Sequence, residues 1–204
     1  WLGAAGARLN AEKSSPKEEV AIASVAEDDY CTPKLKSIVR RVATACGLIG
    51  GSGRGCQPMQ AQQVAQLSDD EFNALFRPLS KKAHIVQFDR DEMMLDQGAR
   101  DSIEQAWGDQ GGASFFFVVS RASPDGNAKH NEELSAGRAR SVLEHLEQKF
   151  EDPDLKKQVG LLWLGEGFAQ LDETFCTWNR SRADTCTETE INRSAFMAWI
   201  DCAI

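Results

Sequence analysis

The chain contains no long hydrophobic run. None of its apolar stretches approaches the roughly 18 residues that a membrane-spanning helix needs. It also lacks the Gly-x-Ser-x-Gly turn of many serine hydrolases and the Gly-Lys-Ser/Thr phosphate loop of nucleotide-binding proteins. Only three histidines are present, at no ligand spacing to a cysteine, and there is no Cys-x-x-Cys pair. These absences argue against a membrane-spanning helix, a serine hydrolase, a nucleotide-binding protein and a zinc protein.

Positive charge is also scarce. Lys and Arg together number 23 against 31 Asp and Glu, which gives a formal net charge of −8. Nucleic acids and anionic lipids are usually bound by clustered Lys and Arg. The basic run at 34–41 is interleaved with apolar residues, as on the exposed face of a helix. We therefore expect no nucleic acid as a partner, and membrane association only through an N-terminal anchor that this chain lacks.

The six cysteines give a further indication of class. An even number without metal-ligand spacing favours disulfides formed in an oxidising compartment over a metal site. We therefore expect no metal and no other cofactor.

Three parts are expected along the chain. Residues 1–29 are rich in Ala, Glu, Lys and Ser and lack large apolar anchors, which is typical of a flexible linker. Residues 30–82 have helical patterns and contain three of the cysteines. Residues 83–204 hold the longest apolar patterns and are expected to form the main domain.

The part at 30–82 is expected to be a small helical extension. Thr32 can cap a helix that has Pro33 at its first position, with apolar residues at three- and four-residue steps over 35–49. Short helices are predicted at 60–67 and 68–76, the second opened by a Ser-Asp-Asp-Glu capping box. So small a segment must pack onto the main domain to bury its apolar face.

The main domain is predicted to be an α/β fold, an α+β sandwich with element order β-α-β-α-β-β. Strands are expected at 84–89, 114–119, 159–164 and 194–200, and helices at 96–107 and 134–150. Helices between strands call for a mixed sheet, with the helices on one side. Phe116 and Trp163 are expected as buried strand residues, covered by Leu143 and Leu146.

Four short motifs occur in order in this domain. They are His84-Ile-Val-Gln-Phe-Asp89, Asn131-x-x-Leu-Ser-x-x-Arg-Ala139, Gly165-Glu-Gly167 and Asn192-Arg193. Together they resemble the OmpA-like (OmpA/MotB C-terminal) peptidoglycan-associating domain over about 84–201. The resemblance implies a non-enzymatic module of the bacterial periplasm, anchored to the outer or inner membrane.

The resemblance also implies a ligand site. In the family, an Asp meets the ammonium of diaminopimelate in the peptidoglycan stem peptide, and an Arg meets its carboxylate. Arg138 matches that Arg, and Arg can hold a carboxylate through two parallel hydrogen bonds. The position of the family Asp falls on Ser123, which carries no charge. Asn131 and Arg193, from the matching motifs, complete the candidate set with Asp125.

Two interpretations of Asp125 remain open. Its carboxylate substitutes for the missing Asp if the Pro-Asp-Gly turn carries it inward. Otherwise Asp125 is an ordinary turn residue, since Pro-Asp-Gly is a common turn sequence.

Disulfide pairing follows partly from the resemblance. Some members close a loop just before the Asn-Arg pair with a disulfide, which implies a bond between Cys176 and Cys186. The other cysteines lie at positions 31, 46, 56 and 202 and allow three pairings. We favour Cys46–Cys56, which closes a Gly-rich loop. That choice leaves Cys31–Cys202, which links the extension to the last strand.

Two functions remain at this point. The first is a non-catalytic periplasmic anchor that binds peptidoglycan through diaminopimelate and attaches an envelope complex to the cell wall. The second is a degenerate module that keeps the fold but serves as a structural or protein-interaction component, with other envelope proteins as partners. Arg138 favours the first and Ser123 the second.

Overall fold

The computed structural model describes residues 30–45, 47–50, 59–60, 67–113, 115–152, 155–184 and 186–203. The predicted linker at 1–29 and the predicted Cys46–Cys56 pair lie outside these residues. Most of the helix predicted at 60–67 does so as well.

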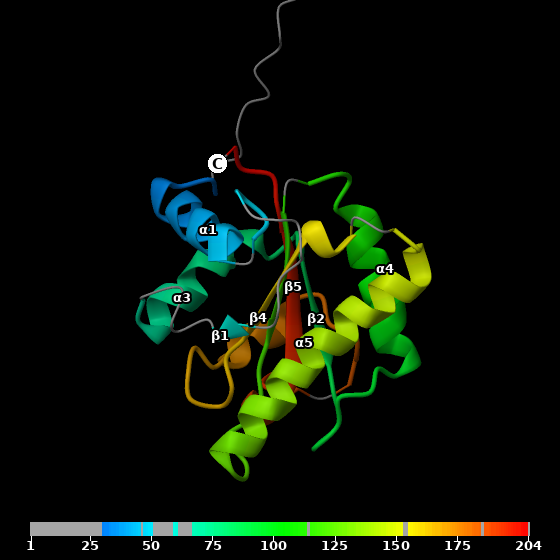
Figure 1. Cartoon of the computed structure of the whole chain (residues 1–204). Coiled ribbons are helices and arrows are strands. Elements are labelled where there is room, and N and C mark those ends of the chain that lie inside the picture. Colours follow the sequence, from blue (N-terminus) through cyan, green and yellow to red (C-terminus); the bar gives the residue numbers. More distant parts are fainter. Residues whose placement is uncertain are drawn as a thin grey trace, which may run out of the picture.

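The main sheet forms in the predicted order. Its elements are β2 (Ala83–Gln87), α4 (Gln97–Asp109), β3 (Phe115–Ser120), α5 (Ala128–Phe150), β4 (Val159–Trp163) and β5 (Ser194–Ile200). β3 and β4 are parallel, whereas β5 pairs antiparallel with both β3 and β2. The sheet is therefore mixed, and the predicted α/β fold is confirmed (Figure 1).

A short fifth strand precedes the main domain in the chain. β1 (Met59–Gln60) pairs in parallel with β4, so the strand order is β1-β4-β3-β5-β2. Gln60 thus lies in a strand, and its assignment to a helix was wrong. Apolar spacing in so short a window does not separate helix from strand. The open edge of β4, with its unpaired backbone groups, decides the conformation.

Helices α4 and α5 cover one face of the sheet. Phe116 is buried on this face, where its ring lies 5.2 Å from that of Trp107 in α4. Leu143 and Leu146 of α5 are buried as predicted. Trp163 is only half-buried, contrary to prediction, because it is the last residue of β4 and lies where the strand gives way to a loop.

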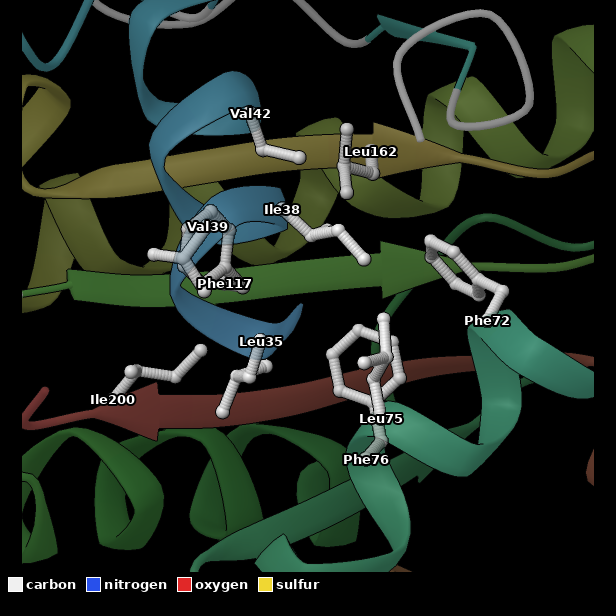
Figure 2. A pocket seen from close by; sticks show the side chains of 10 residues that line it. All are labelled: Leu35, Ile38, Val39, Val42, Phe72, Leu75, Phe76, Phe117, Leu162 and Ile200. Atoms are coloured by element: carbon white, nitrogen blue, oxygen red, sulfur yellow. The ribbon is translucent and has the colours of Figure 1, made fainter. Parts of the chain in front are cut away.

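The extension covers the opposite face with α1 (Pro33–Ala45) and α3 (Asp69–Phe76). Successive strand residues point to opposite faces, so Phe117 faces away from α4 and α5. Figure 2 shows Phe117 together with Leu162 of β4 and Ile200 of β5, facing apolar side chains of α1 and α3. A small apolar cavity of about 20 Å³ remains between them. The central strands are therefore buried on both faces.

Capping residues set where the helices begin. The predicted capping box of α3 is present: Glu71 N–H donates to the Ser68 hydroxyl at 3.4 Å, and Ser68 N–H donates to the Glu71 carboxylate at 3.2 Å. α5 begins at Ala128, six residues before the predicted start, because the side chain of Asn127 caps it. The first turn of α5 consequently lies inside the loop that carries the candidate site.

Two disulfides agree with the predicted pairs. Cys31 and Cys202 are bonded with a Cα–Cα distance of 5.5 Å, and Cys176 and Cys186 with 5.8 Å. The first bond joins the start of α1 to the end of β5. Beside it, the Tyr30 hydroxyl accepts hydrogen bonds from the backbone N–H of Asp201 and from Lys82 Nζ, each at 3.2 Å. The extension is thus attached covalently to the main sheet.

The packing of α5 gives a first prediction. Leu143→Ala should lower the free energy of unfolding by about 2–5 kcal/mol, since it leaves a cavity between α5 and the sheet. Chemical denaturation measures this loss. Glu144→Ala, on the exposed side of the same helix, is the control and should change stability by less than about 0.5 kcal/mol. A loss in Leu143→Ala as small as that of the control would contradict this packing.

A second prediction concerns pH. His84 of β2 is buried, with Asn179 Nδ2 at 3.0 Å and the Asp109 carboxylate at 3.9 Å. Burial lowers its pKa below the ordinary 6.5, against the opposing charge of Asp109. The unfolded chain then binds the proton more readily than the folded one, so stability should fall as the pH drops below about 6.5.

Urea denaturation between pH 7.5 and pH 5 measures this slope. It should be smaller in His84→Gln, whereas His130→Gln, an exposed site, should keep it. Equal slopes in wild type and His84→Gln would show that another group is responsible.

Candidate ligand-binding site

The candidate site lies at one end of the sheet, where β3 and β4 finish and β5 begins (the lower end in Figure 1). The loop after β3 carries Ser123 and Asp125, α5 carries Asn131 and Arg138, and Arg193 directly precedes β5. Parallel strands end at the same edge of a sheet, and an antiparallel neighbour begins there. The topology therefore brings together residues that are up to 70 positions apart.

Ser123, Asp125 and Arg193 form one polar cluster. Ser123 Oγ donates to Asp125 Oδ2 at 3.3 Å. Arg193 donates from Nε to Ser123 Oγ at 3.3 Å and from Nη2 to Asp125 Oδ2 at 3.1 Å. Asp125 stays exposed in the Pro-Asp-Gly turn, in which Gly126 adopts a φ of 113° that other residues rarely reach, and its carboxylate contacts this cluster. The carboxylate therefore lies beside Ser123.

Asp125 reaches solvent in this cluster, whereas Ser123 is buried and Arg193 is half-buried. The Asp125 side chain is 43% exposed and that of Arg193 is 20% exposed. The hydrogen bond from Arg193 lowers the pKa of Asp125, and Ser123 and the charge of Arg90 act in the same direction. Asp125 is therefore ionised at neutral pH, and a charged pair of opposite sign is presented at the surface.

Arg138 is placed differently from the prediction. Its side chain is fully buried and donates to three backbone carbonyls: Glu92 at 3.0 Å, Arg121 at 2.9 Å and Asp89 at 3.1 Å. Its guanidinium also lies 5.1 Å from the ring centre of Phe88. Burial, and the charge of Arg193, lower the pKa of Arg138 to about 10, so it remains charged. These contacts join the loops after β2 and β3.

The two asparagines of the motifs hold loops in place. Asn131 Nδ2 donates to the carbonyls of Ser123 at 3.2 Å and Asp125 at 3.3 Å, and also to the Glu166 carboxylate. The Asn192 side chain accepts from the N–H of Leu171 at 2.7 Å and donates to its carbonyl at 2.9 Å. Asn131 thus holds the loop after β3, which carries Asp125.

Asp91, His130 and Arg121 of this region were not among the predicted site residues. Asp91, on the loop after β2, lies 3.3 Å from His130 Nε2 at the start of α5. Arg121 begins the loop after β3 and is fully buried. Its position two residues before the predicted Ser123 was a signal, but its burial depends on contacts with α3 that sequence reasoning did not anticipate.

A cleft of about 270 Å³ adjoins the turn that carries Asp125. Its lining residues come from that turn, the loop after β4 and α6 (Glu188–Ile191). They are Pro124, Gln170, Leu171, Asp172, Glu188, Thr189 and Asn192. This lining includes two carboxylates and no basic side chain. Among the described residues, no His, Cys, Asp and Glu cluster is arranged to hold a metal ion.

Comparisons with known proteins place this geometry in context. No protein-family model matches the chain, and no curated protein does. The chain is similar to an OmpA-like domain. That domain belongs to FopA1 from Francisella tularensis subsp. tularensis SCHU S4; the match has 17% identity and a TM-score of 0.38, and covers 56% of this chain and 71% of that one.

The burial of Arg138 gives a third prediction. Arg138→Met should lower the free energy of unfolding by about 3–5 kcal/mol, because one buried and two partly buried carbonyls lose a charged donor. Arg140→Met is the matched control: Arg140 lies two positions on, at the exposed surface of the same helix, and its loss should change stability little. Thermal or urea unfolding compares the two. Equal stabilities would show that Arg138 does not hold the loops.

Proposed function

We propose that this chain is a non-catalytic domain of the bacterial periplasm that binds the stem peptide of peptidoglycan through diaminopimelate. It thereby anchors an envelope complex to the cell wall. The observation that carries this proposal is the exposed pair of Asp125 and Arg193, joined through Ser123.

The pair suits a zwitterion such as the end of a diaminopimelate side chain. The ligand ammonium would bind Asp125 and Ser123, and the ligand carboxylate would bind Arg193. An exposed ion pair contributes only about 0–1 kcal/mol, so replacing it with two ligand contacts requires little energy. Asp125 thereby supplies the negative charge that the family Asp would provide at the position of Ser123.

In this proposal Arg138 holds the loops after β2 and β3 in place and is a framework arginine that does not contact the ligand. The resemblance implied that it binds the ligand carboxylate, but its donors are directed to Asp89, Glu92 and Arg121. Arg193 takes over the role of accessible cation. Burial is the main cause of the lowered pKa of Arg138, and the charge of Arg193 lowers this pKa further, so the two arginines interact.

The cleft offers space for more of the ligand. It shares the turn at Pro124 with the charged pair, and its acidic rim suits the amide and ammonium donors of a stem peptide. An oxidising compartment is supported by the two disulfides. Among the described residues, no helix is long and apolar enough to cross a membrane.

A specific observation favours a second function. Arg193 already neutralises Asp125, and Arg138 is occupied by backbone carbonyls. A site closed in this way also fits a degenerate module that no longer binds peptidoglycan and serves as a structural or protein-interaction component of an envelope complex.

A fourth prediction separates the two functions. Wild-type protein should sediment with purified sacculi and bind the tripeptide L-Ala-γ-D-Glu-meso-diaminopimelate in calorimetry. Asp125→Asn and Arg193→Gln should each weaken tripeptide binding about 10- to 100-fold, since each removes a charge-assisted hydrogen bond. Glu144→Gln and Arg140→Gln change the same charges on the exposed side of α5 and should bind like wild type.

A double variant sharpens this test. Ser123→Asp combined with Asp125→Asn moves the carboxylate to the position of the family acid and should restore binding lost in Asp125→Asn. If neither wild type nor the double variant binds sacculi or tripeptide while both remain folded, the peptidoglycan proposal is wrong. The second function then stands.

A further inference from the structure

Helix α3 of the N-terminal extension contacts the loop after β3 and the loop after β4, which together surround the candidate site. Asn73 Nδ2 donates to the carbonyl of Gln170 at 2.8 Å, and its Oδ1 accepts from Arg121 Nη2 at 3.1 Å. Gln170 lines the cleft, and Arg121 lies two residues before Ser123. One amide side chain therefore contacts both loops.

A second residue of α3 holds the loop after β4. Asp69 Oδ2 accepts from the N–H of Ala169 at 3.0 Å. Ala169 has a φ of 49°, in the left-handed region, which is unfavourable for a residue with a side chain. Its carbonyl accepts from Arg121 Nε at 2.8 Å. The unusual backbone conformation at Ala169 is thus supported on both sides by side chains.

Arg121 connects these contacts to the site residues. Its carbonyl accepts from Arg138 at 2.9 Å, and its N–H donates to the carbonyl of Ser194, the neighbour of Arg193, at 2.8 Å. Any shift of Arg121 would therefore move the framework arginine, the accessible arginine and the turn with Asp125.

The side chain of Arg121 depends on α3. It is fully buried, burial lowers its pKa to about 9, and Nη1 has no hydrogen-bond partner among the described residues. Its hydrogen-bonded donors reach neutral oxygens of Asn73 and Ala169. A buried charge left without acceptors is strongly unfavourable. Without Asn73, Arg121 would have to move, and the loop would move with it.

We propose that α3 controls the shape of the binding site, with Asn73 as a positioning residue that acts through Arg121. The inference rests on the proposed function for its ligand. The extension is then part of the binding unit.

The test compares variants of Asn73 in the full chain. Asn73→Leu removes both hydrogen bonds at similar size, whereas Asn73→Asp keeps an oxygen for Arg121. Asp70→Asn, on the exposed side of α3, is the control. Asn73→Leu should weaken binding of the diaminopimelate tripeptide about 3- to 30-fold. Asn73→Asp should recover much of that loss, and the control should match wild type.

Nuclear magnetic resonance supplies a readout that does not need the ligand. In Asn73→Leu, the backbone amides of Ser123 and Asp125 and the Nε–Hε signal of Arg193 should shift, while Asp70→Asn leaves them unchanged. If Asn73→Leu fails to fold, Asp69→Ala removes the acceptor of Ala169 and should shift the same signals. Unshifted site signals in the folded variant would overturn the inference.

The two proposals can fail separately. If wild type binds the tripeptide and Asn73→Leu binds equally well with unshifted signals, the positioning role is wrong and the proposed function stands. If wild type does not bind but the site signals shift in Asn73→Leu, the proposed function is wrong and control of the loops by α3 stands.

Discussion

The buried guanidinium of Arg138 is the contact on which the geometry of the site depends. It donates to the carbonyls of Asp89 and Glu92 after β2 and of Arg121 after β3. Loop carbonyls that are shielded from water need donors, and one planar side chain with five N–H groups serves one buried and two partly buried carbonyls. The two loops are therefore fixed relative to α5. The exposed pair of Asp125 and Arg193 is presented on a rigid base.

A second buried arginine extends this framework to the other face of the sheet. Arg121 links the site loop to Ala169 and to Asn73 of α3, and neither partner is a carboxylate. Neutral acceptors keep the positive charge of Arg121 unbalanced, as they do for Arg138. Two positive charges are therefore buried in the loop and the helix that carry Ser123 and Asn131. Asp125 supplies the opposite charge at the surface, where an ammonium can reach it.

Much of the fold could be predicted from local patterns. The apolar runs of β3 and β4, the alternation in β2 and the capping box of Ser68 each specify structure within a few residues. The start of α5 was missed because Asn127 lies in a polar loop, where a cap looks like any turn residue. Gln60 was missed since pairing with β4 is a long-range contact. The hydrophobic periodicity of the sequence does not indicate such a pairing.

The sequence motifs named residues that are neighbours in the structure, but they did not predict which of these residues reach solvent. Ser123, Asp125, Asn131 and Arg193 do gather in one cluster. Which arginine reaches solvent depends on burial, however, and burial depends on the whole fold. The motif placed Arg138 in the ligand role, whereas the loops after β2 and β3 enclose it. The contact between Asp125 and Arg193 likewise joins residues 68 positions apart, which no local sequence pattern specifies.

The two disulfides stabilise different parts of the structure. Cys31–Cys202 lies at the end of β5, away from the site, and attaches α1 there. Cys176–Cys186 closes a loop whose Arg182 donates to Asp89 at 2.8 Å and to Asp96, the cap of α4. The Asp89 carbonyl also accepts a hydrogen bond from Arg138. The second disulfide thus supports the same loop as the buried arginine, and an oxidising environment favours an ordered site.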